Sequence, residues 1–308
     1  MLHINRTLHS ILTSLILMLV PSASAQLLSG ALGDITMGDS LIEVQAQIEN
    51  KCTDIEVIQP DEIRFPLAQN SESRIVCKAF TITQDSDIEL ITFSFADDHL
   101  VMIKAIGNAY DTLLSPKEKP QSKIADWDIY NGMHLVANQK TDTVWLLNDD
   151  AIHPHMFLWD DNEPKDQSPI DATISEVLKF GSAYRTLSKE LKALSITTSK
   201  EEISPPTIPT NPKRQVQLNC YGFNYAGAPR KLEAVFADGR LAMVWILTAK
   251  AEEDRIRQAL IRSYGEPIFT SDEIEAFDEW KVVLRKDKPE VVAISDELIP
   301  FMKSFFGG

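Results

Sequence analysis

The sequence lacks the short motifs by which several large enzyme classes are recognised. It contains no glycine-rich phosphate-binding loop, no dinucleotide-binding fingerprint and no Gly-x-Ser-x-Gly nucleophile motif. It also contains neither His-Glu-x-x-His nor paired Cys-x-x-Cys motifs, which are the specific signals of zinc sites. We therefore find no positive indication of an enzyme, and the sequence predicts no cofactor and no resident metal.

Long hydrophobic runs are missing after residue 25, which argues against a stable membrane anchor. The apolar run Ile11–Val20 follows Arg6 and precedes an Ala-x-Ala cleavage site. It is about half the length of a membrane-spanning helix, which needs roughly 20 residues. These features predict a signal peptide over residues 1–25 and export to the periplasm or the medium. The first mature residue would be Gln26, which offers no thiol for a lipid.

Basic residues are outnumbered in this chain. It has 30 lysines and arginines against 45 aspartates and glutamates, which gives a formal net charge of -15. A chain of this charge repels nucleic acid and anionic lipid, so we expect neither as a partner. Hydrophobic residues make up 44% of the sequence, which is enough for packed cores and excludes a disordered acidic tail.

What the sequence does contain is an internal repeat. A shift of 143 residues places Gly38 on Gly181, and a shift of 141 residues pairs Phe-Ala-Asp-Asp-His-Leu at 95–100 with Phe-Ala-Asp-Gly-Arg-Leu at 236–241. Because the matches keep their order along the chain, they predict a tandem duplication.

Each copy has the periodicity of an α+β unit. Leu41, Val44 and Ile48 recur at helical spacing, and apolar runs of strand length follow them. We predict the order α-βββ-α-ββ, with an antiparallel meander sheet followed by a second helix and a hairpin. The first unit would span residues 26–160, the junction residues 161–174 and the second unit residues 175–308.

A proline-rich stretch, Ser204–Pro212, has the composition of a linker. The repeat argues against that interpretation, because the stretch corresponds to part of the first unit between its helix and its first predicted strand. We therefore predict a long helix-to-strand loop inside the second unit. The polar stretch at 160–169, which contains two prolines, is the better candidate for the junction.

The second unit also carries a family resemblance. After the 236–241 match, a helix ends in Tyr-Gly-Glu-Pro at 264–267, and Trp280 and Val-Ala-Ile-Ser-Asp-Glu-Leu at 292–298 follow. This combination resembles exported bacterial domains of the duplicated β-lactamase-inhibitor-protein fold and related small outer-membrane lipoproteins. The resemblance covers most of the second unit and the first unit loosely. It implies helices packed on an antiparallel sheet, and it implies no chemistry.

The three cysteines are divided unequally between the copies. Cys77 and Cys220 occupy equivalent positions of the repeat, whereas Cys52 aligns with Ser195. In an exported chain this pattern favours a disulfide between Cys52 and Cys77 and a buried free thiol at Cys220, with reduced buried thiols as the alternative. Closing a loop of about 26 residues would stabilise the first unit by about 3.5 kcal/mol on the chain-entropy model.

Two histidines offer the sharpest chemical alternative. His153 and His155 flank a proline and lie near four aspartates, at 149, 150, 160 and 161, which are all plausible ligands for a divalent ion. The equivalent place in the second unit is apolar, Ile299-Pro300-Phe301, which favours histidines that pack at the edge of a unit.

The five tryptophans are candidates for an exposed sheet face, because large amphipathic aromatics dominate binding hot spots. Helices on one side of each predicted sheet would leave the other side open. Trp245, Trp145 and Trp159 are our candidate binding residues, and burial in the core is the alternative for each. Trp245 is the most suggestive, because its counterpart in the first unit is Lys104.

These observations favour a non-catalytic periplasmic binding or inhibitory protein. Such a protein would act through its sheet faces, or the groove between its units, on a protein or an envelope component. The alternative is an envelope hydrolase or divalent-metal-binding protein that uses His153 and His155.

Overall fold

A computed structural model describes residues 32–83, 86–114, 119–159 and 170–306. The predicted signal peptide and Gln26 lie outside the described residues, as does most of the predicted junction. None of the helices that are described is long and apolar enough to cross a membrane.

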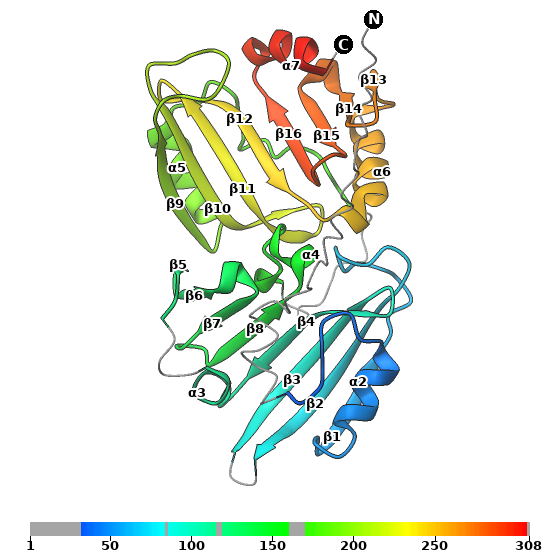
Figure 1. Ribbon diagram of the computed structural model, residues 1–308. Coiled ribbons are helices and arrows are strands. Elements are labelled where there is room, and N and C mark those ends of the chain that lie inside the picture. Colours follow the sequence, from blue (N-terminus) through cyan, green and yellow to red (C-terminus); the bar gives the residue numbers. More distant parts are fainter. Residues whose placement is uncertain (1–31, 84–85, 115–118, 160–169, 307–308) are drawn as a thin grey trace, which may run out of the picture.

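The described residues form an α+β structure with two antiparallel eight-stranded sheets and few helices (Figure 1). The strands of sheet A, in spatial order, are β1 (Asp54–Ile58), β2 (Glu72–Thr83), β3 (Ser86–Ala96), β4 (His99–Ile106), β8 (Thr143–Leu147), β7 (Leu135–Asn138), β6 (Trp127–Tyr130) and β5 (Ser122–Ile124). Those of sheet B are β9 (Thr197–Ile203), β10 (Gln215–Tyr225), β11 (Ala228–Ala237), β12 (Arg240–Leu247), β16 (Glu290–Ile294), β15 (Val282–Arg285), β14 (Ile274–Phe277) and β13 (Phe269–Thr270).

The two sheets have the same strand order when each is followed from its first strand in the sequence. The predicted meanders are β2–β4 and β10–β12, and the predicted hairpins are β7–β8 and β15–β16. The order α-βββ-α-ββ was incomplete, because β1, β5 and β6 and their counterparts β9, β13 and β14 were not predicted. These strands are short, or, like β9, they lie at a sheet edge with mostly exposed polar residues.

Helices pack on one face of each sheet. Sheet A carries α2 (Leu41–Ile48) and α3 (Ala109–Leu113), and sheet B carries α5 (Tyr184–Ala193) and α6 (Glu253–Tyr264). Helix α2 begins with a capping box in which Ser40 and Glu43 each satisfy a backbone N–H of the other. Helix α4 (Asp149–Ile152) and the 3-10 helix η2 (Met156–Leu158) lie at the junction of the two halves, and α7 (Ile299–Phe306) lies at the far end of sheet B (Figure 1).

The proline-rich stretch lies between two paired strands of sheet B, β9 and β10. It therefore does not separate two domains, and it connects strand to strand where we expected helix to strand. The side-chain oxygen of Gln215 accepts hydrogen bonds from the backbone N–H groups of Thr207 and Ile208. In sheet A, Glu72 accepts the N–H groups of Arg64 and Phe65 in the same way. Both loops are thus held by the first residue of the following strand.

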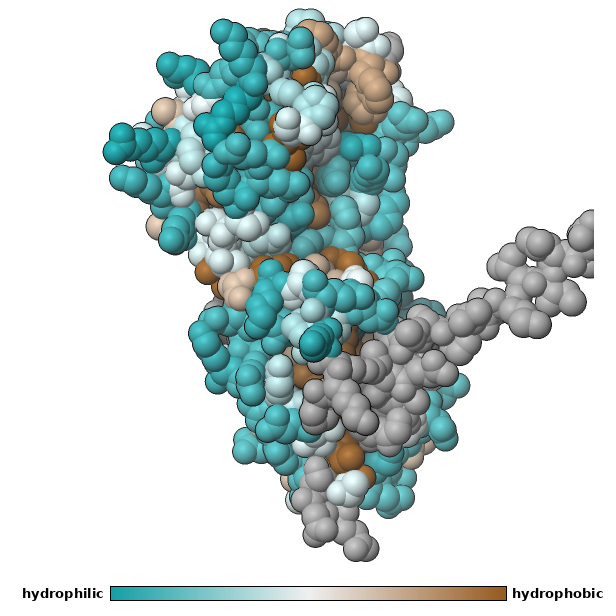
Figure 2. All heavy atoms as spheres, turned by 60° about the vertical axis from the view of Figure 1, so that its left-hand side comes forward, coloured by the Kyte–Doolittle hydropathy of each residue, from teal (hydrophilic) through white to brown (hydrophobic). Residues whose placement is uncertain are grey.

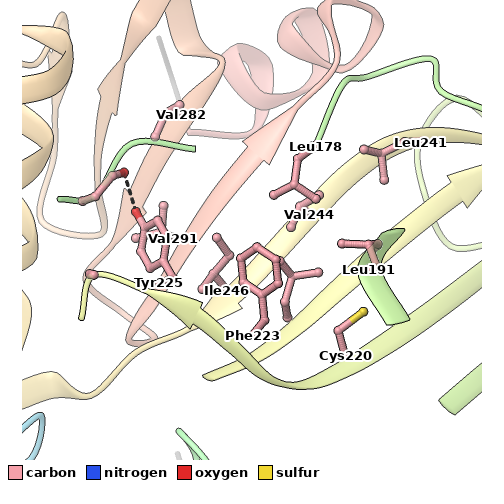
Figure 3. Close-up of a cluster of buried hydrophobic side chains, with 14 of the residues drawn as sticks. Leu178, Leu191, Cys220, Phe223, Tyr225, Leu241, Val244, Ile246, Val282 and Val291 are labelled. Atoms are coloured by element: carbon pink, nitrogen blue, oxygen red, sulfur yellow. Dashed lines mark hydrogen bonds between the residues drawn. The ribbon is translucent and has the colours of Figure 1, made fainter. Parts of the chain in front are cut away.

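The helix-covered face of sheet B forms one of the main cores of the molecule. Figure 3 shows Phe223, Val244 and Ile246 of the sheet gathered with Leu191 of α5. The hydroxyl of Tyr225 donates a hydrogen bond of 2.8 Å to the carbonyl of Ala172. Residues 170–174, which we assigned to the junction, thus pack on sheet B instead of forming a free linker.

The predicted disulfide is present. Cys52, just after α2, is bridged to Cys77 in β2, with a Cα–Cα distance of 5.6 Å. Cys220 is a buried free cysteine, and burial raises the pKa of its thiol to about 12. The bridge therefore ties α2 to sheet A, while Cys220 stays protonated at neutral pH and reacts poorly.

Candidate functional site

Trp245 lies on the face of sheet B that faces away from α5 and α6. Its neighbours along β12, Val244 and Ile246, point into the helix-covered core, so Trp245 points to the opposite face. Its cross-strand neighbours are Glu233 on β11 and Val292 on β16. The indole is half-buried, so part of it stays open to a ligand.

Polar side chains in fixed pairs surround this indole. The guanidinium carbon of Arg285 lies 5.5 Å from the centre of the Trp245 ring, and Arg285 also forms an ion pair of 3.2 Å with Glu290. On the other side, Lys231 pairs with Glu233. We call the surface made by these residues the Trp245 face; its members are Gln217, Asn219, Tyr221, Lys231, Glu233, Trp245 and Arg285.

Both ends of the Trp245 face are covered. At one end α7 and Ile208 pack over the sheet. At the other end η2 packs against β11, and the ring of His155 lies 5.5 Å from the ring of Tyr221. The uncovered middle therefore presents Trp245 beside four half-buried polar side chains, those of Gln217, Lys231, Glu233 and Arg285.

The other two candidate tryptophans do not belong to this surface. Trp145 is 2% exposed and Trp159 is 3% exposed, so neither side chain is available on an open face. Phe65 and the residues of η2 pack with both of them in one buried cluster. The expected open face of sheet A is thus closed at this place by chain segments that the strand pattern did not reveal.

The two histidines lie at the junction of the two halves but do not converge. The Nε2 atom of His153 is 3.1 Å from the carbonyl oxygen of Pro289. His155 is 8% exposed, and its Nδ1 atom is 3.1 Å from the carbonyl oxygen of His153. Within the described part of the chain, no three His, Cys, Asp or Glu side chains form a group that could hold a metal ion. Asp160 and Asp161 of the metal hypothesis lie outside the described residues.

A groove of about 670 Å³ separates the two halves next to His153. Figure 2 shows a waist between two mostly hydrophilic bodies, with hydrophobic residues at the surface there. Its acidic lining is largely engaged by the chain itself. Asp97 accepts the N–H groups of Gln69, Asn70 and Ser71, which hold its pKa below the usual value although burial opposes them. Glu253 pairs with Lys250.

An arginine that sequence reasoning missed joins the two halves. The guanidinium of Arg255, on α6, donates to the carbonyl oxygens of Ala68 at 2.7 Å and Phe65 at 2.9 Å. Burial lowers the pKa of this side chain, although it stays charged because arginine titrates far above neutral pH. Its partners are backbone atoms nearly 190 residues away, so no sequence motif indicates the contact.

Comparisons with protein-family models, with curated proteins and with solved structures give no match for this chain. The resemblance to the β-lactamase-inhibitor-protein fold therefore stays a prediction.

Proposed function

We propose that this chain is an exported, non-catalytic binding protein built by duplication of one α+β unit. The common strand order of the two sheets supports the duplication. So do matching backbone bonds: the N–H of Gly38 donates to Leu100, and that of Gly181 donates to Leu241, each at 2.8 Å. The disulfide supports export, because such bonds persist in oxidising compartments.

Recognition takes place on the Trp245 face in this proposal. The observation that carries it is a half-buried indole held among ion-paired side chains on a sheet face that α5 and α6 leave open. Aromatic side chains of this kind supply much of the binding energy in protein interfaces. Their paired neighbours lose little conformational freedom on binding, which lowers the entropic cost of association. The partner is a protein or a cell-envelope component.

The test is capture of the partner by immobilised protein from the native envelope, followed by titration of the identified partner. Trp245→Ala should weaken binding about 30-fold, which corresponds to about 2 kcal/mol. Leu194→Ala is the matched control, because Leu194 is 47% exposed and follows α5 on the other side of sheet B. Equal affinities of the Trp245→Ala variant and the wild type would refute the assignment of this face.

A further inference from the structure

A buried histidine sits at the contact between the two halves. His155, from the first half, packs against Phe157 of its own segment at 6.0 Å and against Tyr221 of sheet B at 5.5 Å, measured between ring centres. Its Nδ1 atom faces a backbone carbonyl, that of His153. The imidazole therefore fills an aromatic site that spans the junction.

The charged groups around the His155 ring make its protonation unfavourable. Lys231, on β11, lies over the ring of Tyr221, with its Nζ atom 5.9 Å from the ring centre. The positive charge of Lys231 raises the free-energy cost of protonating His155. Lys231 is paired with Glu233, which faces the Trp245 side. Burial, reinforced by Lys231, lowers the pKa of His155 to about 4.

Other titratable groups lie at the junction as well. Asp97, Lys250 and Glu253 line the groove between the halves, and Arg255 donates across it to the carbonyl oxygens of Ala68 and Phe65. His153 is hydrogen-bonded to Pro289 and lies near Glu290 of β16. Burial raises the pKa of Glu290, so this carboxyl takes up a proton at a higher pH than an ordinary glutamate.

The junction is small compared with the cores on either side of it. In the buried cluster that spans it, sheet B and its flanks contribute Tyr221, Ala228 and Ala249. Separate clusters lie between sheet A and α2 and between sheet B and α5. Each half can therefore stay folded when the contact between them is lost.

We propose that protonation of His155 opens the junction and uncovers the Tyr221–Lys231 end of the Trp245 face. The opening itself is independent of the proposed function, and only its consequence for recognition rests on that function. Acid would enlarge the surface available to a partner, because η2 and His155 cover that end in the closed form.

The test uses the full chain with fluorophores attached at Ile42→Cys and Leu194→Cys, one exposed position in each half. Cys220 is buried with a raised pKa and should not be labelled. Energy transfer and the scattering radius of gyration are followed from pH 7.5 to pH 3.5, with circular dichroism as the check that the halves stay folded. Energy transfer should fall in acid, as the open-to-closed ratio rises by up to roughly 300-fold.

His155→Asn is the decisive variant. His155 has a φ of 60°, which asparagine tolerates better than most residues, and asparagine does not titrate. This variant should keep its energy transfer across the same pH range.

Lys231→Met should move the opening to lower pH. Removing the neighbouring charge brings the pKa of His155 in the closed state nearer to its pKa in the open state. A wild type that stays closed while folded, or a His155→Asn variant that opens at the same pH, would overturn the proposal. Failure to find a partner would leave this result unaffected.

Discussion

The two sheets each carry a tryptophan on the face away from their helices, and a cation lies over each indole. Lys104 is 5.0 Å from the centre of the Trp145 ring, and Arg285 is 5.5 Å from that of Trp245. Yet Trp145 is 2% exposed, whereas Trp245 is half-buried. The difference arises from the segments that follow each sheet. Phe65 and η2 join Trp145 in a buried cluster, while α7 packs towards one end of the Trp245 face. A similar strand arrangement thus gives a core residue in one sheet and a surface residue in the other.

The largest expected effect is on the free energy of unfolding, which should depend on how deeply each tryptophan is buried. Trp145→Ala should lower the free energy of unfolding by about 4 kcal/mol, because it leaves a large cavity in a buried cluster. Trp245→Ala should cost about 1 kcal/mol, since part of its side chain is already in water. Urea unfolding monitored by circular dichroism measures both values. Equal losses would mean that the two indoles are equally part of the core.

A smaller effect on stability is expected from adding to the second half the disulfide that the first half has. The first half has the Cys52–Cys77 bridge, whereas in the second half the side chain of Ser195 lies close to the thiol of Cys220. Ser195→Cys should therefore form a second disulfide and stabilise sheet B by about 3.5 kcal/mol, for a loop as long as that in the first half. Thiol titration of the unfolded, non-reduced protein should find no free thiol. Two free thiols in this variant would show that positions 195 and 220 do not have disulfide geometry.

The central strands of both sheets could be predicted because their apolar residues alternate or run continuously. Asp97 and Asp98, and likewise Asp238 and Gly239, take the positive φ angles that a tight hairpin requires, as the turn sequences indicate. Edge strand β9 could not be predicted, because its sequence Thr-Thr-Ser-Lys-Glu-Glu-Ile has little apolar alternation. The disulfide followed from the predicted repeat, because Cys77 aligns with Cys220 while Cys52 aligns with a serine, Ser195.

The candidate site was predicted less completely. The choice of Trp245 as a candidate followed from its alignment with Lys104 in the internal repeat. The burial of Trp145 and Trp159 did not, because it depends on Phe65 and on η2, which join the cluster from segments outside the strands. The contact of His155 with Tyr221 likewise joins residues far apart in the chain. Such contacts are set by how the two halves pack, and strand periodicity carries no signal of that packing.

Oxidative footprinting of the tryptophans tests the central claim most directly. Hydroxyl radicals generated in the free protein should oxidise Trp245, which is half-buried, and leave Trp145 unmodified. When the captured partner is bound at saturation, oxidation of Trp245 should fall several-fold while that of Trp145 is unchanged. Oxidation of Trp245 at the same rate in the free and the bound protein would contradict the account.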